Sequence, residues 1–393
     1  MNILKTISLN SILYAILLFL SVWGTLQINK PNIPLSNLMY YGSLFALFYI
    51  KKGAISKSIC DLKPIFYILI IGIVLLIAKG ISNENYMDSI CTFFKFFWVC
   101  ILLEKAKPKE LTLSKIITII FLILNCLIMI YERSIMTVLF WNSEDYGTWR
   151  DKITELTQFR ASGLTGHPVL GAFLVTMELA FIQFSRLKNK WKYGFTVLLF
   201  ISLLCLNSRS NIIISAAMSI YLFKDALLNK KNRFLKILLL AATFYFFSNL
   251  IVNTDWGGRL INNELGESDS STMARLDIFG FVRYLNWNQL LWGGFGLEEY
   301  IMKVMGMAGI ENGYIVLVLK YGLIGGVPLI VALIYYQWKV LFIYPKIERL
   351  IIFFVFVVMA NTNPHIGHAI PWIYWGIYYY LFRPDPIPIS INK

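Results

Sequence analysis

Residues 311–326 read E-N-G-Y-I-V-L-V-L-K-Y-G-L-I-G-G and open a long apolar segment. A helix needs about 20 apolar residues to cross the hydrocarbon core of a bilayer. Apolar segments of this kind recur along the whole chain. Their apolar runs are continuous rather than alternating, which argues against a β-barrel. The sequence therefore predicts an all-α polytopic integral membrane protein.

The composition supports this fold class. Of the 393 residues 58% are hydrophobic and 15% are charged, and the mean hydropathy is +0.64. We predict one transmembrane domain, 1–393, with twelve helices. Segment 8–28 lacks a small-residue cleavage site and is predicted as the first transmembrane helix instead of a signal peptide. The predicted helices span 8–28, 36–50, 64–80, 88–104, 114–131, 168–186, 193–207, 210–226, 234–252, 311–337, 349–361 and 369–382.

The charges predict the orientation of these helices. With the N-terminus in the cytoplasm, roughly two thirds of the 36 lysine and arginine residues fall in inside segments. Most of the 22 acidic residues fall outside. The positive-inside rule then places both termini in the cytoplasm. The net charge of +14 is thereby assigned to loops that face membrane lipid, and it gives no sign of nucleic-acid binding.

Two predicted outside loops are long, 132–167 and 253–310. Loops longer than about 15 residues usually carry function or are disordered. The second loop contains an amphipathic stretch at 272–292 and is rich in tryptophan and glycine. We therefore predict interfacial helices in it.

Arginine stands in three short motifs on the predicted outer side. Arg160 begins R-A-S-G-L-T-G-H-P, just before a helix start whose N–H groups suit an anion. Arg209 lies in the tight turn N-S-R-S-N, at a depth where a charge costs a few kcal/mol without a partner. Arg275 lies in A-R-L-D-I-F of the larger loop. A guanidinium fork fits phosphate oxygens. Three alternative interpretations remain: Arg160 as a solvated loop arginine, Arg209 as a contact to lipid phosphate, and Arg275 in a surface ion pair with Asp277.

A carboxylate and an amide, Glu311 and Asn312, precede the long apolar segment. Glu311 is interpreted either as a charge stabilised by the helix dipole or as a general base beside a hydroxyl group. The candidate substrate-binding residues are Arg160, Asn312, Tyr314, His167 and Arg259.

The remaining reactive side chains give weaker signals. The five cysteines lie in or beside apolar segments without C-x-x-C spacing, so we interpret them as small buried hydrophobes. His365 and His368 have no third ligand nearby, so neither a metal nor a cofactor is predicted. Lys95, Glu178 and Lys320 are candidate intramembrane charges whose partners the sequence does not identify.

In their order and common side, these motifs resemble those of the bacterial O-antigen polymerase family, within the O-antigen polymerase and ligase superfamily. The resemblance covers the whole chain in topology, with an enlarged outer loop before the tenth helix. At motif level it rests on R-x-x-G-x-x-x-x-P at Arg160, S-R at Ser208–Arg209, A-R-L at Arg275 and x-N-x-Y…G-L-I-G at 311–325. In the ligase branch a histidine typically precedes the asparagine. Glu311 at that position favours the polymerase branch.

The resemblance implies a metal-independent, type C glycosyltransferase-like membrane enzyme with its active site at the periplasmic face of the bacterial inner membrane. Such an enzyme would transfer a growing glycan from undecaprenyl diphosphate to the non-reducing end of a new lipid-linked repeat unit. The catalytic residues would be Arg209 and Arg275, as a diphosphate clamp, and Glu311, beside the acceptor hydroxyl. Arg160 would be a further contact.

The implied partners are lipid-linked oligosaccharide and polysaccharide, membrane lipid, and the chain-length regulator and flippase proteins of the same pathway. Two alternative functions stay open: an O-antigen ligase or related lipid-linked glycan transferase, and a lipid-linked oligosaccharide flippase or another transporter.

Overall fold

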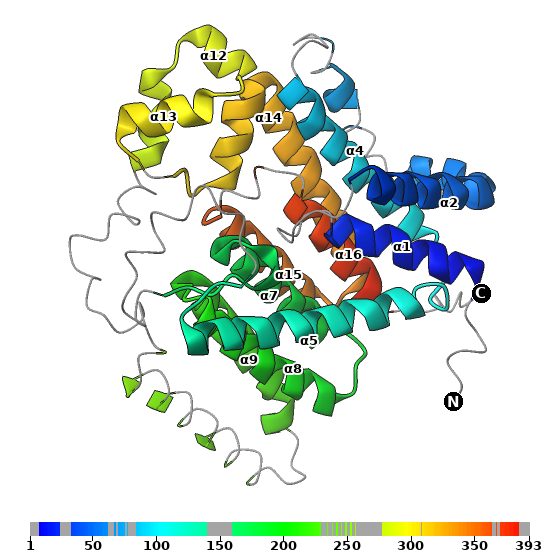
Figure 1. Ribbon diagram of the computed structural model, residues 1–393, viewed down its shortest axis with the longest axis vertical. Helices are drawn as coiled ribbons and strands as arrows, with labels where there is room; N and C mark the ends of the chain where they lie inside the picture. The colour runs from blue at the N-terminus through cyan, green and yellow to red at the C-terminus, as the bar shows by residue number, and fades with distance from the viewer. Residues whose placement is uncertain are drawn as a thin grey trace.

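The structure is a computed structural model that describes residues 8–23, 33–61, 84–139, 159–228, 277–307, 309–363 and 370–384, with scattered residues between 67 and 77 and between 234 and 256, and Gly367. Every regular element in these ranges is helical (Figure 1). The α-helices are α1 (Leu9–Trp23), α2 (Ile33–Asp61), α4 (Glu84–Glu104), α5 (Thr112–Ile135), α7 (Pro168–Gln183), α8 (Asn189–Cys205), α9 (Arg209–Leu228), α12 (Trp287–Trp292), α13 (Leu297–Met305), α14 (Gly313–Val340), α15 (Lys346–Ala360) and α16 (Ile370–Phe382). Short 3₁₀ helices are η2 (Gly163–Thr165), η4 (Ile278–Tyr284) and η5 (Leu341–Ile343).

A described helix lies in every predicted range except 64–80 and 234–252, which fall mostly outside the described residues. The largest difference is at α2, which continues to Asp61 where the sequence predicted an end at residue 50. The polar residues after 50 include lysines, which are good helix formers, so the helix outlasts its apolar part.

The core of the bundle surrounds α7. All residues of α7 except Val169 are buried, as expected for a helix that is apolar all round. It packs against α8, α9, α15 and α16 and lies near the middle of the molecule (Figure 1). Glu178, the predicted intramembrane acid of α7, accepts a hydrogen bond from the hydroxyl of Tyr378 on α16.

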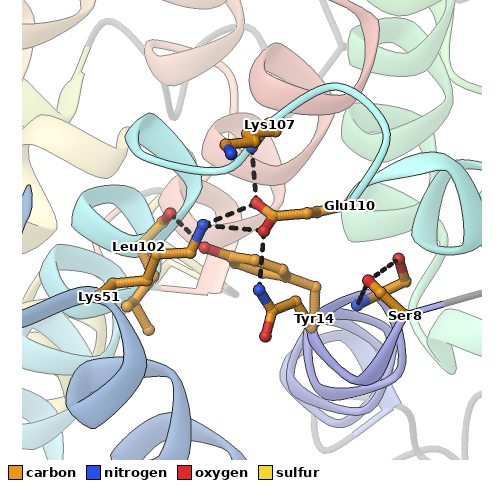
Figure 2. A network of polar contacts seen from close by, with 8 residues as sticks. Ser8, Tyr14, Lys51, Leu102, Lys107 and Glu110 are labelled. Carbon is orange, nitrogen blue, oxygen red and sulfur yellow. Dashed lines mark hydrogen bonds and ion pairs between the residues drawn. The ribbon is translucent and has the colours of Figure 1, made fainter.

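Polar contacts fasten α1 and α2 to the turn between α4 and α5 (Figure 2). The carboxylate of Glu110 accepts two hydrogen bonds from Lys51 Nζ, at 2.9 and 2.8 Å. It also accepts from Asn10 Nδ2 at 2.8 Å and from the backbone N–H of Lys107 at 2.7 Å. We call these four residues the Glu110 clasp. Burial raises the pKa of the Glu110 carboxyl, but the hydrogen bonds and the charge of Lys51 outweigh this effect, and the pKa lies below its ordinary value of 4.5.

The C-terminal end of α16 lies at the same end of the bundle as the Glu110 clasp. Arg383 Nη1, directly after α16, pairs with Glu104 Oε2, at the end of α4, at 3.0 Å. Lys115, in the first turn of α5, stands over the ring of Phe382 at 5.1 Å. Segments that the charge pattern predicts on one side of a membrane are thus neighbours in space.

Two described helices are long and apolar enough to cross a membrane. They are residues Thr112–Ile135 and Gly313–Ile343, the second of which continues α14 into η5. The helix α5 exposes a line of large apolar side chains that includes Ile120, Leu124 and Leu127. A surface of this kind is stable in contact with lipid tails and is rare on soluble proteins.

The long helix α14 is broken at Gly322, whose φ of 69° and ψ of 177° are not helical. Residues 277–307, with η4, α12 and α13, fold against the part of α14 that precedes the break (Figure 1). Gly294 N–H donates to the carbonyl oxygen of Leu319 at 2.9 Å. Lys320, a predicted intramembrane charge, pairs with Glu298 of α13 at 3.7 Å. Residues 277–307 make up most of the described part of the larger loop.

Candidate functional site

The segment 159–167 lies on the end of α5 that is far from the Glu110 clasp. Glu132, in the last turns of α5, is separated from Glu110 by about 30 Å of helix. Phe159 and residues 161–166 are buried, whereas Arg160 and His167 are partly exposed. The segment therefore hides its backbone and presents the two side chains that the sequence singled out.

Side chains of α5 accept hydrogen bonds from the backbone of this segment. Glu132 Oε2 accepts from the N–H groups of Ser162 and Gly163, both at 2.8 Å. Asn125 Oδ1 accepts from the N–H of Leu164, also at 2.8 Å. Asn125 and Glu132 are seven residues apart, which places them on one face of the helix, two turns from each other. With Met129 between them they form what we call the α5 cradle.

Gly163 fits into the α5 cradle because it has no side chain. Its φ is +57°, and a β-carbon would lie 2.6 Å from Asn125 Oδ1 and 2.8 Å from Met129 Cγ. Left-handed backbone with so little space is compatible with glycine alone. The glycine of the R-x-x-G motif thus has a structural explanation.

Arg160 connects the segment to the turn between α8 and α9. Its Nε donates to the carbonyl oxygen of Leu206 at 3.1 Å, and the next residue, Ala161, donates its N–H to the carbonyl oxygen of Cys205 at 3.0 Å. Arg209 follows in the same turn as the first, partly buried residue of α9. A cation is disfavoured at a helix N-terminus. Arg209 within this turn and Arg160 hydrogen-bonded to it thus bring two cations to the same region, where an anion would be favoured.

His167 is the N-cap of α7. Its Nδ1 accepts a hydrogen bond from the N–H of Val169 at 3.2 Å, and Pro168 occupies the first helical position. Farther along, the middle of α7 contacts the first turn of α9, because Thr176 Oγ1 donates to Asn211 Oδ1 at 3.3 Å. His167 therefore has a capping role, and substrate binding by its other ring nitrogen stays a prediction.

Asn312 is the N-cap of α14. Its Oδ1 accepts from the N–H groups of Tyr314 and Ile315 at 3.0 and 3.1 Å, and the side chain is 4% exposed. The helix starts at Gly313, two residues later than predicted, so Glu311 lies before the N-cap and outside the first turn. Glu311 therefore precedes the helix that the sequence predicts it to open, and it is partly exposed.

The segment after α15 joins the starts of α7 and α14. Asn361 Oδ1 accepts from Asn312 Nδ2 at 3.3 Å, and Asn363 Nδ2 donates to the carbonyl oxygen of Val169 at 3.1 Å. Two residues of one short turn thus contact both helix starts. This contact could not be predicted from the sequence, because asparagines in a turn have no distinctive spacing.

These contacts bring most of the predicted site to one end of the bundle. The α5 cradle holds the segment between Arg160 and His167, the turn between α8 and α9 carries Arg209, and the turn after α15 reaches the start of α14. The members described there are Arg160, His167, Arg209, Glu311, Asn312 and Tyr314. Two further predicted members, Arg259 and Arg275, lie outside the described residues.

Sequence reasoning missed the cradle. Glu132 and Asn125 lie on a helix that reads as a plain transmembrane segment, and Glu132 follows directly after its predicted end. The one signal was a carboxylate next to an arginine at the end of an apolar run, opposite a glycine-rich segment.

The described residues contain a crevice away from this end. It lies between α1, α5 and α16 and is lined by Ala15, Leu18, Phe19, Ser114, Ile117, Thr118, Phe121 and Tyr378. Its lining is mostly apolar and comes from the half of α5 near the Glu110 clasp, so it does not belong to the candidate site. Within the described ranges, no group of three or more His, Cys, Asp or Glu side chains is arranged to hold a metal ion.

Compared with protein-family models, with curated proteins and with solved structures, the chain gives no match.

Proposed function

We propose that this protein is a membrane glycosyltransferase that polymerises a surface polysaccharide of the O-antigen type. The chain would cross the inner membrane twelve times with both termini in the cytoplasm, and the end that carries Arg160 and Arg209 would face the periplasm. The substrate would be an oligosaccharide linked to undecaprenyl diphosphate.

The observation that carries this proposal is the grouping of cations and a carboxylate at one end of an apolar bundle. Arg160 binds the α8–α9 turn that carries Arg209. The turn after α15 links the starts of α7 and α14, directly beside Glu311. A transfer from a lipid diphosphate needs both kinds of group: cations for the leaving phosphates and a base for the acceptor.

In the proposed reaction, the hydroxyl oxygen of the acceptor sugar attacks the anomeric carbon of the donor glycan. The bond between this carbon and the diphosphate oxygen breaks, and its electron pair leaves with the diphosphate. Arg209 and Arg160, with Arg275 contributed by the larger loop, stabilise the added negative charge. Glu311 takes the proton of the acceptor hydroxyl.

Chain growth by the purified protein tests this function directly. The protein is reconstituted in nanodiscs with a lipid-linked repeat unit, and products are resolved by gel and mass spectrometry. We expect Arg209→Ala and Arg275→Ala to reduce the rate by about 10²- to 10³-fold, and Glu311→Gln by about 10²-fold. Lys109→Ala, an exposed cation at the opposite end, serves as the control. Unchanged chain growth in all three variants at equal protein levels would reject the site.

The same preparation distinguishes the alternative functions. An O-antigen ligase would attach preformed polymer to a lipid A core acceptor and would not lengthen the lipid-linked chain. A flippase would move the lipid-linked oligosaccharide across a vesicle membrane without forming a glycosidic bond. Either outcome, in place of chain growth, would replace the polymerase proposal.

A further inference from the structure

Glu132 stands where a carboxylate is unfavourable unless it has a specific task. It lies in the last turns of α5, where a negative charge opposes the helix dipole. It is 0% exposed, and burying an ionised carboxylate is costly without hydrogen-bond partners. Three backbone N–H groups compensate it: those of Ser162 and Gly163 on Oε2, and that of Leu139 on Oε1 at 2.9 Å.

The next residue, Arg133, binds a backbone carbonyl group of the same segment. Arg133 is 0% exposed, and its Nη1 donates to the carbonyl oxygen of Phe159. Glu132 and Arg133, consecutive residues of α5, therefore bind backbone N–H groups and a backbone carbonyl group of the same short segment. Arg160 lies between Phe159 and Ser162, so its Cα is fixed from both sides.

We propose that Glu132 is a positioning residue that sets where Arg160 stands at the candidate site. This inference rests on the proposed function, in which Arg160 contacts the diphosphate of the donor. Without the Glu132 carboxylate the N–H groups of Ser162 and Gly163 lose their acceptor in a buried place. The segment would then leave the α5 cradle, and the guanidinium of Arg160 would move with it.

The first experiment reads the backbone and is independent of activity. Hydrogen–deuterium exchange is measured by mass spectrometry on the wild-type protein and on Glu132→Gln. We expect exchange in the peptide 159–167 to become at least about tenfold faster, because a neutral amide oxygen accepts hydrogen bonds more weakly than a carboxylate and the amide nitrogen accepts none. Exchange in α14 should be unchanged. Equal protection of 159–167 in both proteins would overturn the proposal.

The second experiment separates positioning from a general loss of stability. We expect Glu132→Gln to raise the KM for the lipid-linked donor by about tenfold, with a smaller change in kcat. Arg160→Ala should raise the KM similarly, and the double variant should be no worse than Arg160→Ala alone, since both changes remove one contact. Lys51→Met, which opens the Glu110 clasp at the other end, controls for stability and should leave this KM unchanged.

The outcomes distinguish the two proposals. If Glu132→Gln frees the segment and leaves the KM unchanged while Arg160→Ala raises it, the positioning role is overturned. If Arg160→Ala has no effect on chain growth, the assignment of Arg160 in the proposed function is overturned, whatever the exchange experiment gives. Should Glu132→Gln fail to accumulate, Arg133→Lys, which keeps the charge but not the planar fork, is expected to reproduce the faster exchange and the higher KM.

Discussion

Gly293 and Gly322 meet backbone to backbone, where the end of α12 contacts the break in α14. A β-carbon on Gly293 would lie 2.3 Å from the amide nitrogen of Gly322, and one on Gly322 would lie 2.1 Å from the carbonyl oxygen of Leu291. Both glycines have positive φ, 65° and 69°. The folded part of the larger loop is therefore held on α14 by a contact that only two glycines permit.

We predict that Gly322→Ala separates α12 from α14. The added methyl group meets backbone atoms, which cannot rotate away, and alanine is strained at this φ, so we expect a loss of about 2–4 kcal/mol in the free energy of unfolding. The measurements are the Tm in detergent and the rate of tryptic cleavage within 277–307. Gly280→Ala, with no atom within 4 Å of the new β-carbon, is the matched control. Equal Tm values for the two variants would contradict the packing argument.

We also predict that Gly163→Ala disturbs the α5 cradle. Its β-carbon would lie 2.6 Å from Asn125 Oδ1, so the acceptor of the Leu164 N–H would have to move. We expect a Tm lower by several °C and chain growth reduced at least about tenfold. Gly194→Ala, in open space on α8, should be neutral or slightly stabilising, because alanine favours a helix over glycine. A Gly163→Ala protein with the Tm and chain growth of the wild type would count against the cradle.

Much of the helical framework could be predicted from the sequence. Continuous apolar runs located α5, α7 and α14 within a few residues, because burial in lipid or core requires them. The errors occur where polar residues continue a helix, as in α2 after residue 50, and where a break is hidden inside an apolar run, as at Gly322. Hydropathy describes burial and does not describe backbone angles.

The site was predicted as residue types and not as contacts. Arg160 comes close to the turn that carries Arg209 because Arg160 Nε donates to the carbonyl oxygen of Leu206, 46 positions along the chain. Glu132 was not predicted, since its role depends on backbone N–H groups from another loop. Asn312, a candidate substrate-binding residue, uses its side-chain oxygen to cap α14. A short polar motif indicates that a polar side chain is needed at a position. It does not show whether that side chain caps a helix or contacts a ligand.

The ion pair between Lys320 and Glu298 should respond unequally to the loss of either partner. The Lys320 side chain is 8% exposed and that of Glu298 is 25% exposed. Glu298→Gln removes the carboxylate that pairs with the buried ammonium group of Lys320. Lys320→Met, in contrast, leaves the carboxylate of Glu298 where water can reach it. We expect Glu298→Gln to lower the Tm more than Lys320→Met, and the double variant to recover part of the loss. Thermal unfolding of the three proteins in one detergent is the measurement, and a larger loss in Lys320→Met would refute this order.

The Glu110 clasp should make stability depend on acid. The pKa of Glu110 is below 4.5 in the folded protein, so the folded state favours the carboxylate form. The stabilisation is complete above the ordinary value of 4.5 and is lost as the pH falls through the lower, folded-state pKa. Thermal unfolding of wild type and Glu110→Gln is therefore compared between pH 7 and about pH 3. Glu110→Gln should have a lower Tm than wild type at pH 7, and the difference should shrink toward about pH 3, because protonation removes the same charge in the wild type. When Lys51→Met removes the main cation of the clasp, the Glu110→Gln substitution should lower the Tm by less at pH 7. A Tm difference between wild type and Glu110→Gln that is constant with pH would show that Glu110 acts by packing alone.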